Sequence, residues 1–305
     1  MTRISEIALQ QILLGGFQRA QATAENTQIQ LASGDKFQTY GGYGADALRL
    51  VSAEGIVERA GAYNTASNVA QSRLQTQEQG LTTIANSVAG IQADFVEVLA
   101  TGTPELLVPQ LEVAAQQILT ALNTQLGGVY LFGGTDGTQP AVAASSLADL
   151  GAATSIDTLF QEGARTTIAV EEGVSISGGP VASEVATELL TELRDLANAE
   201  ATLGSFSGNL TDAQRDFLIE KNARLTEINA SLNEALGLNG VAQAQANDAV
   251  ERNTAQRDFA EIVAADIENV DIAEALTRLN QDQLAIQASA QALAQASQLS
   301  LLDFL

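Results

Sequence analysis

The segment LTTIANSVAGIQADFVEV (residues 81–98) decides the fold class of this chain. Its large apolar residues recur in alternating steps of three and four: Leu81, Ile84, Val88, Ile91, Phe95 and Val98. This spacing places one apolar stripe along a helix, as in a coiled coil. Gly102 and Pro104 follow the stripe and interrupt the helix. We therefore predict a long helix that packs along one side and ends near residue 101.

A second stripe of the same kind follows the break. Its members are Leu111, Ala115, Ile118, Leu122, Gln125 and Val129. Because the connection between the two stripes is short, the two helices are predicted to be antiparallel neighbours.

The character of the sequence changes after the second stripe. Residues 129–132 (VYLF) are β-type, and residues 133–137 (GGTDG) indicate a turn. Residues 166–170 (TTIAV) and 174–176 (VSI) predict the two strands of a hairpin around Glu171–Gly173. We interpret residues 136–183 as a small β-containing insertion.

Helical periodicity resumes after the insertion and continues to the C-terminus. Apolar residues at helical spacing occupy 185–196 and 217–232, with Thr211 as a candidate N-cap. Residues 237–240 (GLNG) predict a turn or kink, and a further helix is predicted from about Val241 towards Glu268.

The two ends of the chain are apolar. Near the C-terminus one stripe comprises Ile272, Leu276, Leu279, Ile286, Ala290 and Leu293, and the last seven residues are LSLLDFL. The N-terminus has a weaker counterpart in Ile4, Ala8, Gln11 and Ile12. A free helix that exposes such residues is a liability, so these ends could pack against another chain. They could equally fold back onto the chain's own bundle, and the periodicity leaves both possibilities open.

Composition excludes several functions. The net charge of −23 opposes binding to nucleic acid or to an anionic membrane surface. The chain contains no cysteine or histidine, so thiolate and histidine catalysis and the commonest metal ligands are missing. We predict solvated positions for the acidic pairs Glu171–Glu172 and Asp266/Glu268, and Gly133–Gly137 lacks the P-loop lysine. We expect no catalytic, cofactor or metal site, no cleavable signal peptide and no membrane insertion.

Three segments carry a resemblance to a known family. They are residues 3–5 (RIS) with 29–34 (IQLASG), residues 122–135 (LNTQLGGVYLFGGT), and residues 271–276 (DIAEAL) with 299–305 (LSLLDFL). The chain resembles the flagellin superfamily and, within it, the hook-associated proteins of the hook–filament junction. The resemblance covers about 1–135 and 185–305. Residues 39–47 (TYGGYGADA) contain one acidic residue where flagellins often have paired aspartates.

The resemblance implies a mainly α fold in which both terminal regions form long coiled-coil-like helices around the small outer insertion. It implies an inner helical domain (1–43 with 262–305), a helical rod domain (44–135 with 184–261) and an outer domain (136–183). It further implies type III export to the extracellular flagellum and self-assembly into a ring or helical layer. The expected partners are a neighbouring hook-associated protein, flagellin and an export chaperone. The expected intersubunit packing residues are Ile4, Ile12, Ile272, Leu276, Leu279, Ile286, Leu293, Leu299, Leu301, Leu302, Phe304 and Leu305.

Three alternatives remain at this stage. Filament flagellin is the alternative within the family. A helical signalling bundle shares the alanine- and glutamine-rich heptads, although the β insertion and the lack of a membrane-spanning segment oppose it. An enzyme housed in the insertion would need a mechanism that uses only carboxylates.

Overall fold

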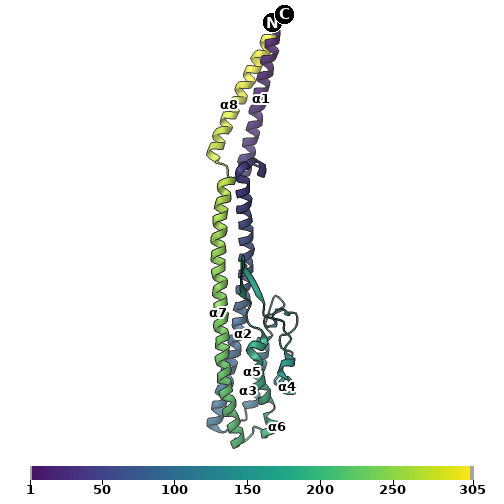
Figure 1. Cartoon of the computed structure of the whole chain (residues 1–305), viewed down its shortest axis with the longest axis vertical. Coiled ribbons are helices and arrows are strands. Elements are labelled where there is room, and N and C mark those ends of the chain that lie inside the picture. Colours follow the sequence, from purple (N-terminus) through teal and green to yellow (C-terminus); the bar gives the residue numbers. More distant parts are fainter. Residues whose placement is uncertain (1, 303–305) are drawn as a thin grey trace. The chain divides into compact units, whose positions relative to one another are not determined.

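The computed structural model describes the backbone of residues 2–302 and the side chains of residues 8 and 11–295. The chain divides into two compact units. Unit 1 comprises residues 1–58 and 256–305, and unit 2 comprises residues 59–255. The boundaries between the units fall within two long helices, α2 (Ala47–Thr101) and α7 (Asp212–Glu268) (Figure 1). The prediction of a mainly α fold built on long helices with a small β-containing part is confirmed.

The predicted stripe at residues 81–98 forms the centre of the core of unit 2. Its residues are buried on α2 and pack with α3 (Leu107–Leu122), α5 (Ala182–Ala197) and α7 in one hydrophobic cluster. The second stripe is shorter than predicted. It ends at Leu122, because Gln125 and Val129 lie in the two-residue strands β1 (Gln125–Leu126) and β2 (Val129–Tyr130) and are exposed.

Helices α2 and α7 run antiparallel in unit 2. Asn64 donates to Thr254 at 3.1 Å, and Gln92 donates to Thr226 at 2.8 Å. The turn or kink predicted at residues 237–240 is wrong, since α7 continues through it. Neither glycine there has a positive φ, and Asn239 between them is buried on the inner side of the helix with Ala242. Packing therefore outweighs the weak helix propensity of glycine, about 1 kcal/mol per residue.

The segment that follows β2 also differs from prediction. Residues 131–133 form a short 3-10 helix, η2 (Leu131–Gly133), rather than the end of a strand. Leu131 and Phe132 are both buried, which a strand with alternating faces does not allow. The carbonyl oxygen of Leu131 accepts hydrogen bonds from Arg73 Nη2 at 2.7 Å and Gln77 Nε2 at 2.8 Å, so α2 holds this segment.

Gly134 explains why glycine stands in the motif at residues 122–135. Its φ is 61°, a conformation that side chains disfavour. A Cβ at this position would also lie 2.5 Å from the carbonyl oxygen of Ala164. The missing side chain lets the amide of Thr135 bind that oxygen at 2.9 Å.

The insertion contains the predicted hairpin, with small changes at its ends. Strands β3 (Thr167–Glu171) and β4 (Val174–Ser177) pair antiparallel in a two-stranded sheet. Two short elements precede the hairpin: α4 (Leu147–Ala152) and the 3-10 helix η3 (Ile156–Leu159). After α5, the short helix α6 (Ala199–Leu203) leads to Thr211, whose hydroxyl caps α7 as predicted by accepting from the amide of Gln214 at 3.2 Å.

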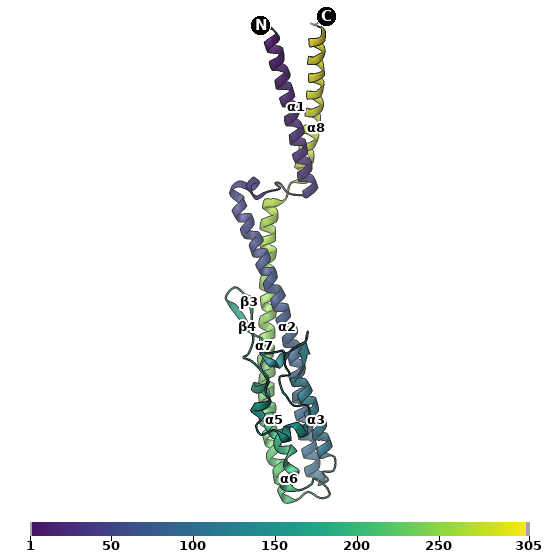
Figure 2. The ribbon, with the colours of Figure 1, turned by 90° about the vertical axis from the view of Figure 1, so that its right-hand side faces the viewer.

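Unit 1 is formed by the two ends of the chain. Helix α1 (Thr2–Ser33) pairs with α8 (Ile272–Leu302), as both views show (Figures 1 and 2). The 3-10 helix η1 (Tyr40–Asp46), the first turns of α2 and the last turns of α7 complete the unit. In the part of the chain that the structure describes, no helix has the length and apolar character to cross a membrane.

Candidate functional site

The interior of unit 1 is made mainly of small residues. Its buried apolar residues are Ala24, Leu50, Ala53, Ala260, Ala264 and Ala275. In contrast, many of the large apolar side chains described in the unit are exposed. The exposed set is Ile12, Leu14, Ile29, Phe37, Tyr40, Leu48, Val51, Phe259, Ile262, Ile272, Leu276 and Leu284.

The pairing of α1 with α8 explains part of this exposure. The side of α1 that is turned inward is Leu13, Phe17, Ala20, Ala24, Thr27 and Leu31, a heptad pattern of buried and half-buried residues. Thr27 is buried, and its hydroxyl donates to the Thr23 carbonyl at 2.9 Å and lies 3.5 Å from Asp282 Oδ2. The small and polar residues between α1 and α8 bury little apolar area, so the contact between the two helices contributes little to stability.

The sequence-predicted packing residues fall into three groups. Leu279, Ile286 and Leu293 are half-buried on α8. Ile12, Ile272 and Leu276 are exposed, by 66%, 61% and 49%. The side chains of Ile4, Leu299, Leu301 and Leu302, and the whole of Phe304 and Leu305, lie outside the described residues. The single C-terminal stripe predicted from the sequence is thus divided between a half-buried and an exposed face of the helix.

Sequence reasoning missed two parts of the exposed surface. Phe259 and Ile262 are 68% and 65% exposed near the end of α7, where their i, i+3 spacing places them on the same face. Leu48 and Val51 have the same spacing at the start of α2 and are also exposed. Helical spacing was the available signal, but it does not tell which apolar face a helix buries.

Two connecting segments, here called the strap, link the helices of unit 1. Residues 34–46 connect α1 to α2, and residues 269–271 connect α7 to α8. Lys36 joins the first segment to the end of α7, because its ammonium donates to the carbonyls of Asp266 at 2.8 Å and Ile267 at 3.0 Å. Its amide donates to the carbonyl of Glu268 at 2.7 Å. A lysine at the end of α7 satisfies carbonyl groups that the helix leaves free and complements the helix dipole.

Three acidic side chains lie near this strap. Tyr40 donates to Glu54 at 2.8 Å, and this hydrogen bond raises the pKa of Tyr40. Partial burial raises the pKa of Glu268, and the charges of Asp35 and Glu54 raise it further. Among the described residues, no group of three acidic side chains has an arrangement that could hold a metal ion.

Lys221 is the one strongly buried cation of unit 2, and it forms ion pairs and a cation–π contact within the unit. Lys221 donates to Glu192 at 2.7 Å and to Asp195 at 2.8 Å, and it lies 5.4 Å from the ring centroid of Phe217. Burial alone would lower the pKa of Lys221, but the hydrogen bonds to the two carboxylates raise it above its usual value. The group is therefore a permanent cation that joins α5 to α7.

The fold and the exposed surface together define a mainly helical protein whose two chain ends fold into one unit, with large apolar side chains exposed among the described residues. Residues 223–305 match the family model of the bacterial flagellin C-terminal helical region. No curated protein sequence matches the chain.

Two solved structures resemble the chain. The first is a protein of Vibrio parahaemolyticus assigned as a flagellar hook-associated protein. It has a TM-score of 0.60 and 14% identity over 73% of this chain and 97% of that chain. The second is FlgL of Bacillus cereus, with a TM-score of 0.48 and 16% identity over 70% of this chain and 98% of that chain. At this level of identity the first match bears on the fold alone.

Residues 223–305 are thus similar to the C-terminal helical region of bacterial flagellin, and this match covers most of α7 and the whole of α8.

Proposed function

We propose that this flagellin-family chain is a hook-associated protein that joins the hook to the filament. In this proposal unit 1 is the surface through which copies assemble into a ring or helical layer. The observation that carries it is the contrast within unit 1, where mostly alanines are buried while large apolar side chains are exposed. Burial of one large apolar side chain contributes about 1.5–3 kcal/mol, so neighbouring subunits would supply the missing stabilisation.

The packing residues inferred from the sequence belong to this proposal, together with Phe259, Ile262, Leu48 and Val51. Phe259 and Ile262 add exposed apolar side chains on the last turns of α7 to those on α8, all within unit 1. The inner domain that we propose consists of residues 1–43 and 262–305. Residues 44–135 with 184–261 would form the rod domain, and residues 136–183 the outer domain.

The junction position is supported by the fold likeness to the Vibrio parahaemolyticus protein that is assigned as hook-associated. The proposed neighbours are another hook-associated protein on the hook side and flagellin on the filament side. Before assembly, an export chaperone would cover the apolar surface of unit 1. Export by the flagellar type III pathway, without cleavage of a signal peptide, completes the proposal.

Filament flagellin is the second candidate, and the match of residues 223–305 to the flagellin C-terminal region favours it. Deletion of the gene separates the two. Loss of a junction protein leaves flagellin synthesised but released into the medium, whereas loss of flagellin leaves bare hooks with no free flagellin. Bare hooks without secreted flagellin would therefore overturn the junction assignment.

Hydrogen exchange tests the role of unit 1 independently of the junction. In a dilute monomer, amides of residues 11–33 and 272–295 should exchange fast, because the α1/α8 seam buries little apolar area. The amides of residues 81–98 should exchange slowly and serve as the internal control. In isolated flagella the same terminal amides should become protected. Strong protection of both terminal segments in the monomer would contradict an assembly role.

A further inference from the structure

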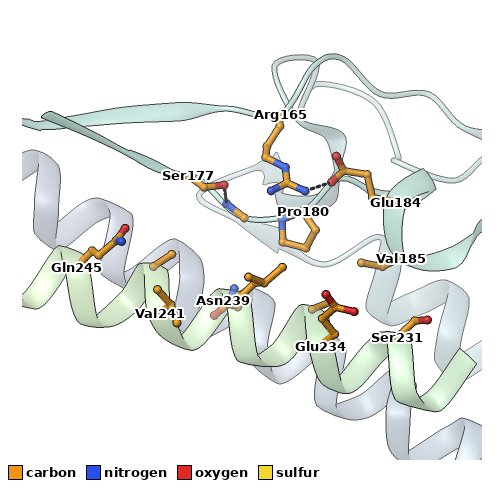
Figure 3. A pocket seen from close by; sticks show the side chains of 14 residues that line it. Arg165, Ser177, Pro180, Glu184, Val185, Ser231, Glu234, Asn239, Val241 and Gln245 are labelled. Atoms are coloured by element: carbon orange, nitrogen blue, oxygen red, sulfur yellow. Dashed lines mark hydrogen bonds and ion pairs between the residues drawn. The ribbon is translucent and has the colours of Figure 1, made fainter. Parts of the chain in front are cut away.

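A cavity of about 340 Å³ lies in unit 2, between α7 and the chain around the β3–β4 hairpin. One wall is a face of α7, and the other is formed by segments between residues 165 and 185 (Figure 3). Its apolar lining comes from Pro180, Val185, Ala235, Leu238, Val241 and Ala242. This volume suits one or two side chains and lies at the small end of ligand sites.

The cavity has an unpartnered hydrogen-bond donor in its lining. Asn239 is only 2% exposed and sits on the face of α7 that borders the cavity (Figure 3). Its Oδ1 accepts from Gln243 Nε2 at 2.7 Å, which fixes the orientation of the amide. Its Nδ2 is buried and has no hydrogen-bond partner among the described residues. A buried donor without a partner costs about 1–3 kcal/mol. Because Nδ2 is itself inaccessible, an acceptor in the cavity recovers part of this cost only when the side chains around Nδ2 shift to admit it.

The mouth of the cavity carries an excess of negative charge. Arg165 and Glu184 neutralise each other in an ion pair of 2.7 Å, which Figure 3 shows above Pro180. Glu234 lies on the opposite wall and has no ion pair among the residues that the structure describes. The remaining carboxylate disfavours an anion and favours a cation close to the apolar lining.

The neighbouring hairpin offers a backbone edge. Strand β4 pairs with β3 on one side only, because the sheet has two strands. Ser177 at the end of β4 and Gly179 just after it both line the cavity. An extended chain that runs past β4 could therefore place a side chain in the cavity, a mode of recognition that uses free strand edges.

From these observations we infer that the cavity binds an extended peptide segment of another protein, in which an aliphatic residue is followed by a lysine or arginine. The aliphatic side chain fills the space between Leu238 and Val185. The carbonyl oxygen of the peptide accepts the hydrogen bond from Asn239 Nδ2. The basic side chain pairs with Glu234 at the mouth. The site belongs to unit 2 and does not depend on where the chain stands in the flagellum.

Three capped dipeptides test the chemistry on the full-length chain: acetyl-Leu-Lys-amide, acetyl-Leu-Glu-amide and acetyl-Gly-Lys-amide. Binding is followed by NMR of the methyl groups of Val185, Leu238 and Val241, which line the cavity. The Leu-Lys peptide should bind at least about tenfold more tightly than either of the others, because it alone has both the apolar and the cationic group. Equal binding of the Leu-Glu or the Gly-Lys peptide would overturn the inference.

Two variants of the cavity lining test the contacts. Asn239→Leu removes the donor and should weaken the Leu-Lys peptide by about tenfold. The change also removes the acceptor of Gln243, but Gln243 keeps its hydrogen bond to Glu78, so the protein should stay folded. Ala235→Met fills the cavity and should abolish binding. The matched control Ala230→Met changes an exposed residue of the same helix outside the cavity and should leave binding unchanged.

The charge at the mouth has its own test. Glu234→Gln should weaken the Leu-Lys peptide severalfold, whereas Glu220→Gln, an exposed carboxylate of α7 outside the cavity, should have no effect. Equal effects of the two changes would show that the −23 charge of the chain attracts any cation, and would overturn the site. Self-association of the chain that Ala235→Met abolishes would assign the cavity to a second copy instead.

Discussion

Units 1 and 2 use the same heptad arrangement of helices but bury different residues. Unit 2 buries leucine, isoleucine, valine and phenylalanine from α2, α3, α5 and α7 in one cluster. Among the side chains that the structure describes, unit 1, the smaller of the two, buries one leucine and five alanines as its apolar residues and exposes twelve large apolar side chains, against ten in unit 2. The comparison teaches that a heptad pattern reports a contact but not whether the contact lies within one chain. An alanine interior buries little apolar area, so it contributes less to the stability of its unit than the interior of unit 2 does.

The largest expected effect is the loss of a central side chain of unit 2. Phe95 is fully buried in the cluster, so Phe95→Ala should lower the free energy of unfolding by about 3–5 kcal/mol. Urea unfolding followed by circular dichroism measures the change. A loss below about 1 kcal/mol would show that the cluster does not hold the unit together.

The matched change in unit 1 is Phe259→Ala, which removes the same group from an exposed position. We expect the free energy of unfolding of the monomer to change by less than about 0.5 kcal/mol. Assembly into flagella should nevertheless fail, as measured by the amount of the chain in sheared filaments and hooks. A destabilised monomer with normal assembly would reverse the roles assigned to the two units.

The substitution of Lys221 is expected to have the next largest effect on the free energy of unfolding. Lys221→Met leaves the carboxylates of Glu192 and Asp195 without their cation, and Glu192 is mostly buried. Breaking a fully buried pair costs about 3–5 kcal/mol, and the partial exposure of Asp195 reduces the expected loss to about 2–3 kcal/mol. Thermal and urea unfolding measure it. Addition of Glu192→Gln should restore part of the loss, and a triple variant with Asp195→Asn should restore more.

A smaller effect is expected in the strap of unit 1. Lys36→Met removes the ammonium that caps the carbonyls of Asp266 and Ile267, at a cost of about 1 kcal/mol. Amide exchange at residues 266–270 should accelerate. Arg49→Met is the control, because Arg49 forms an exposed ion pair with Asp46 and such pairs contribute little. Equal acceleration by both changes would mean that Lys36 has no capping role.

The smallest effect concerns pH. Burial and the charges of Asp35 and Glu54 raise the pKa of Glu268 in the folded state, so its ionised form opposes folding near pH 7. The stabilising contribution of the protonated form is complete below the ordinary glutamate pKa of about 4.3 and is lost as the pH rises through the raised value. Glu268→Gln should therefore stabilise unit 1 at pH 7 and have no effect near pH 4. Glu25 is an exposed carboxylate of α1, and Glu25→Gln should leave the stability unchanged at both pH values.

Sequence patterns predicted the secondary structure best where many apolar residues followed the same period. The stripe from Leu81 to Val98, the break after Thr101 and the hairpin at residues 167–177 follow from local spacing and turn residues. The prediction of a kink at residues 237–240 is wrong, because the packing of buried Asn239 and Ala242 keeps α7 helical despite two glycines. The seam of α1 from Leu13 to Leu31 was missed, since its alanines and its threonine do not stand out as apolar.

The sequence by itself determined the long helices, the absence of histidine and cysteine chemistry and the resemblance to the flagellin family. Periodicity and composition are local properties, and one chain is enough to show them. Only the tertiary structure decided which side of each helix is inside. It turned Leu279 and Ile286 towards the seam of unit 1, left Ile272 and Phe259 outside, and opened a cavity beside Asn239. These outcomes depend on which helices meet and how much area they bury, and residues far apart in the chain set both.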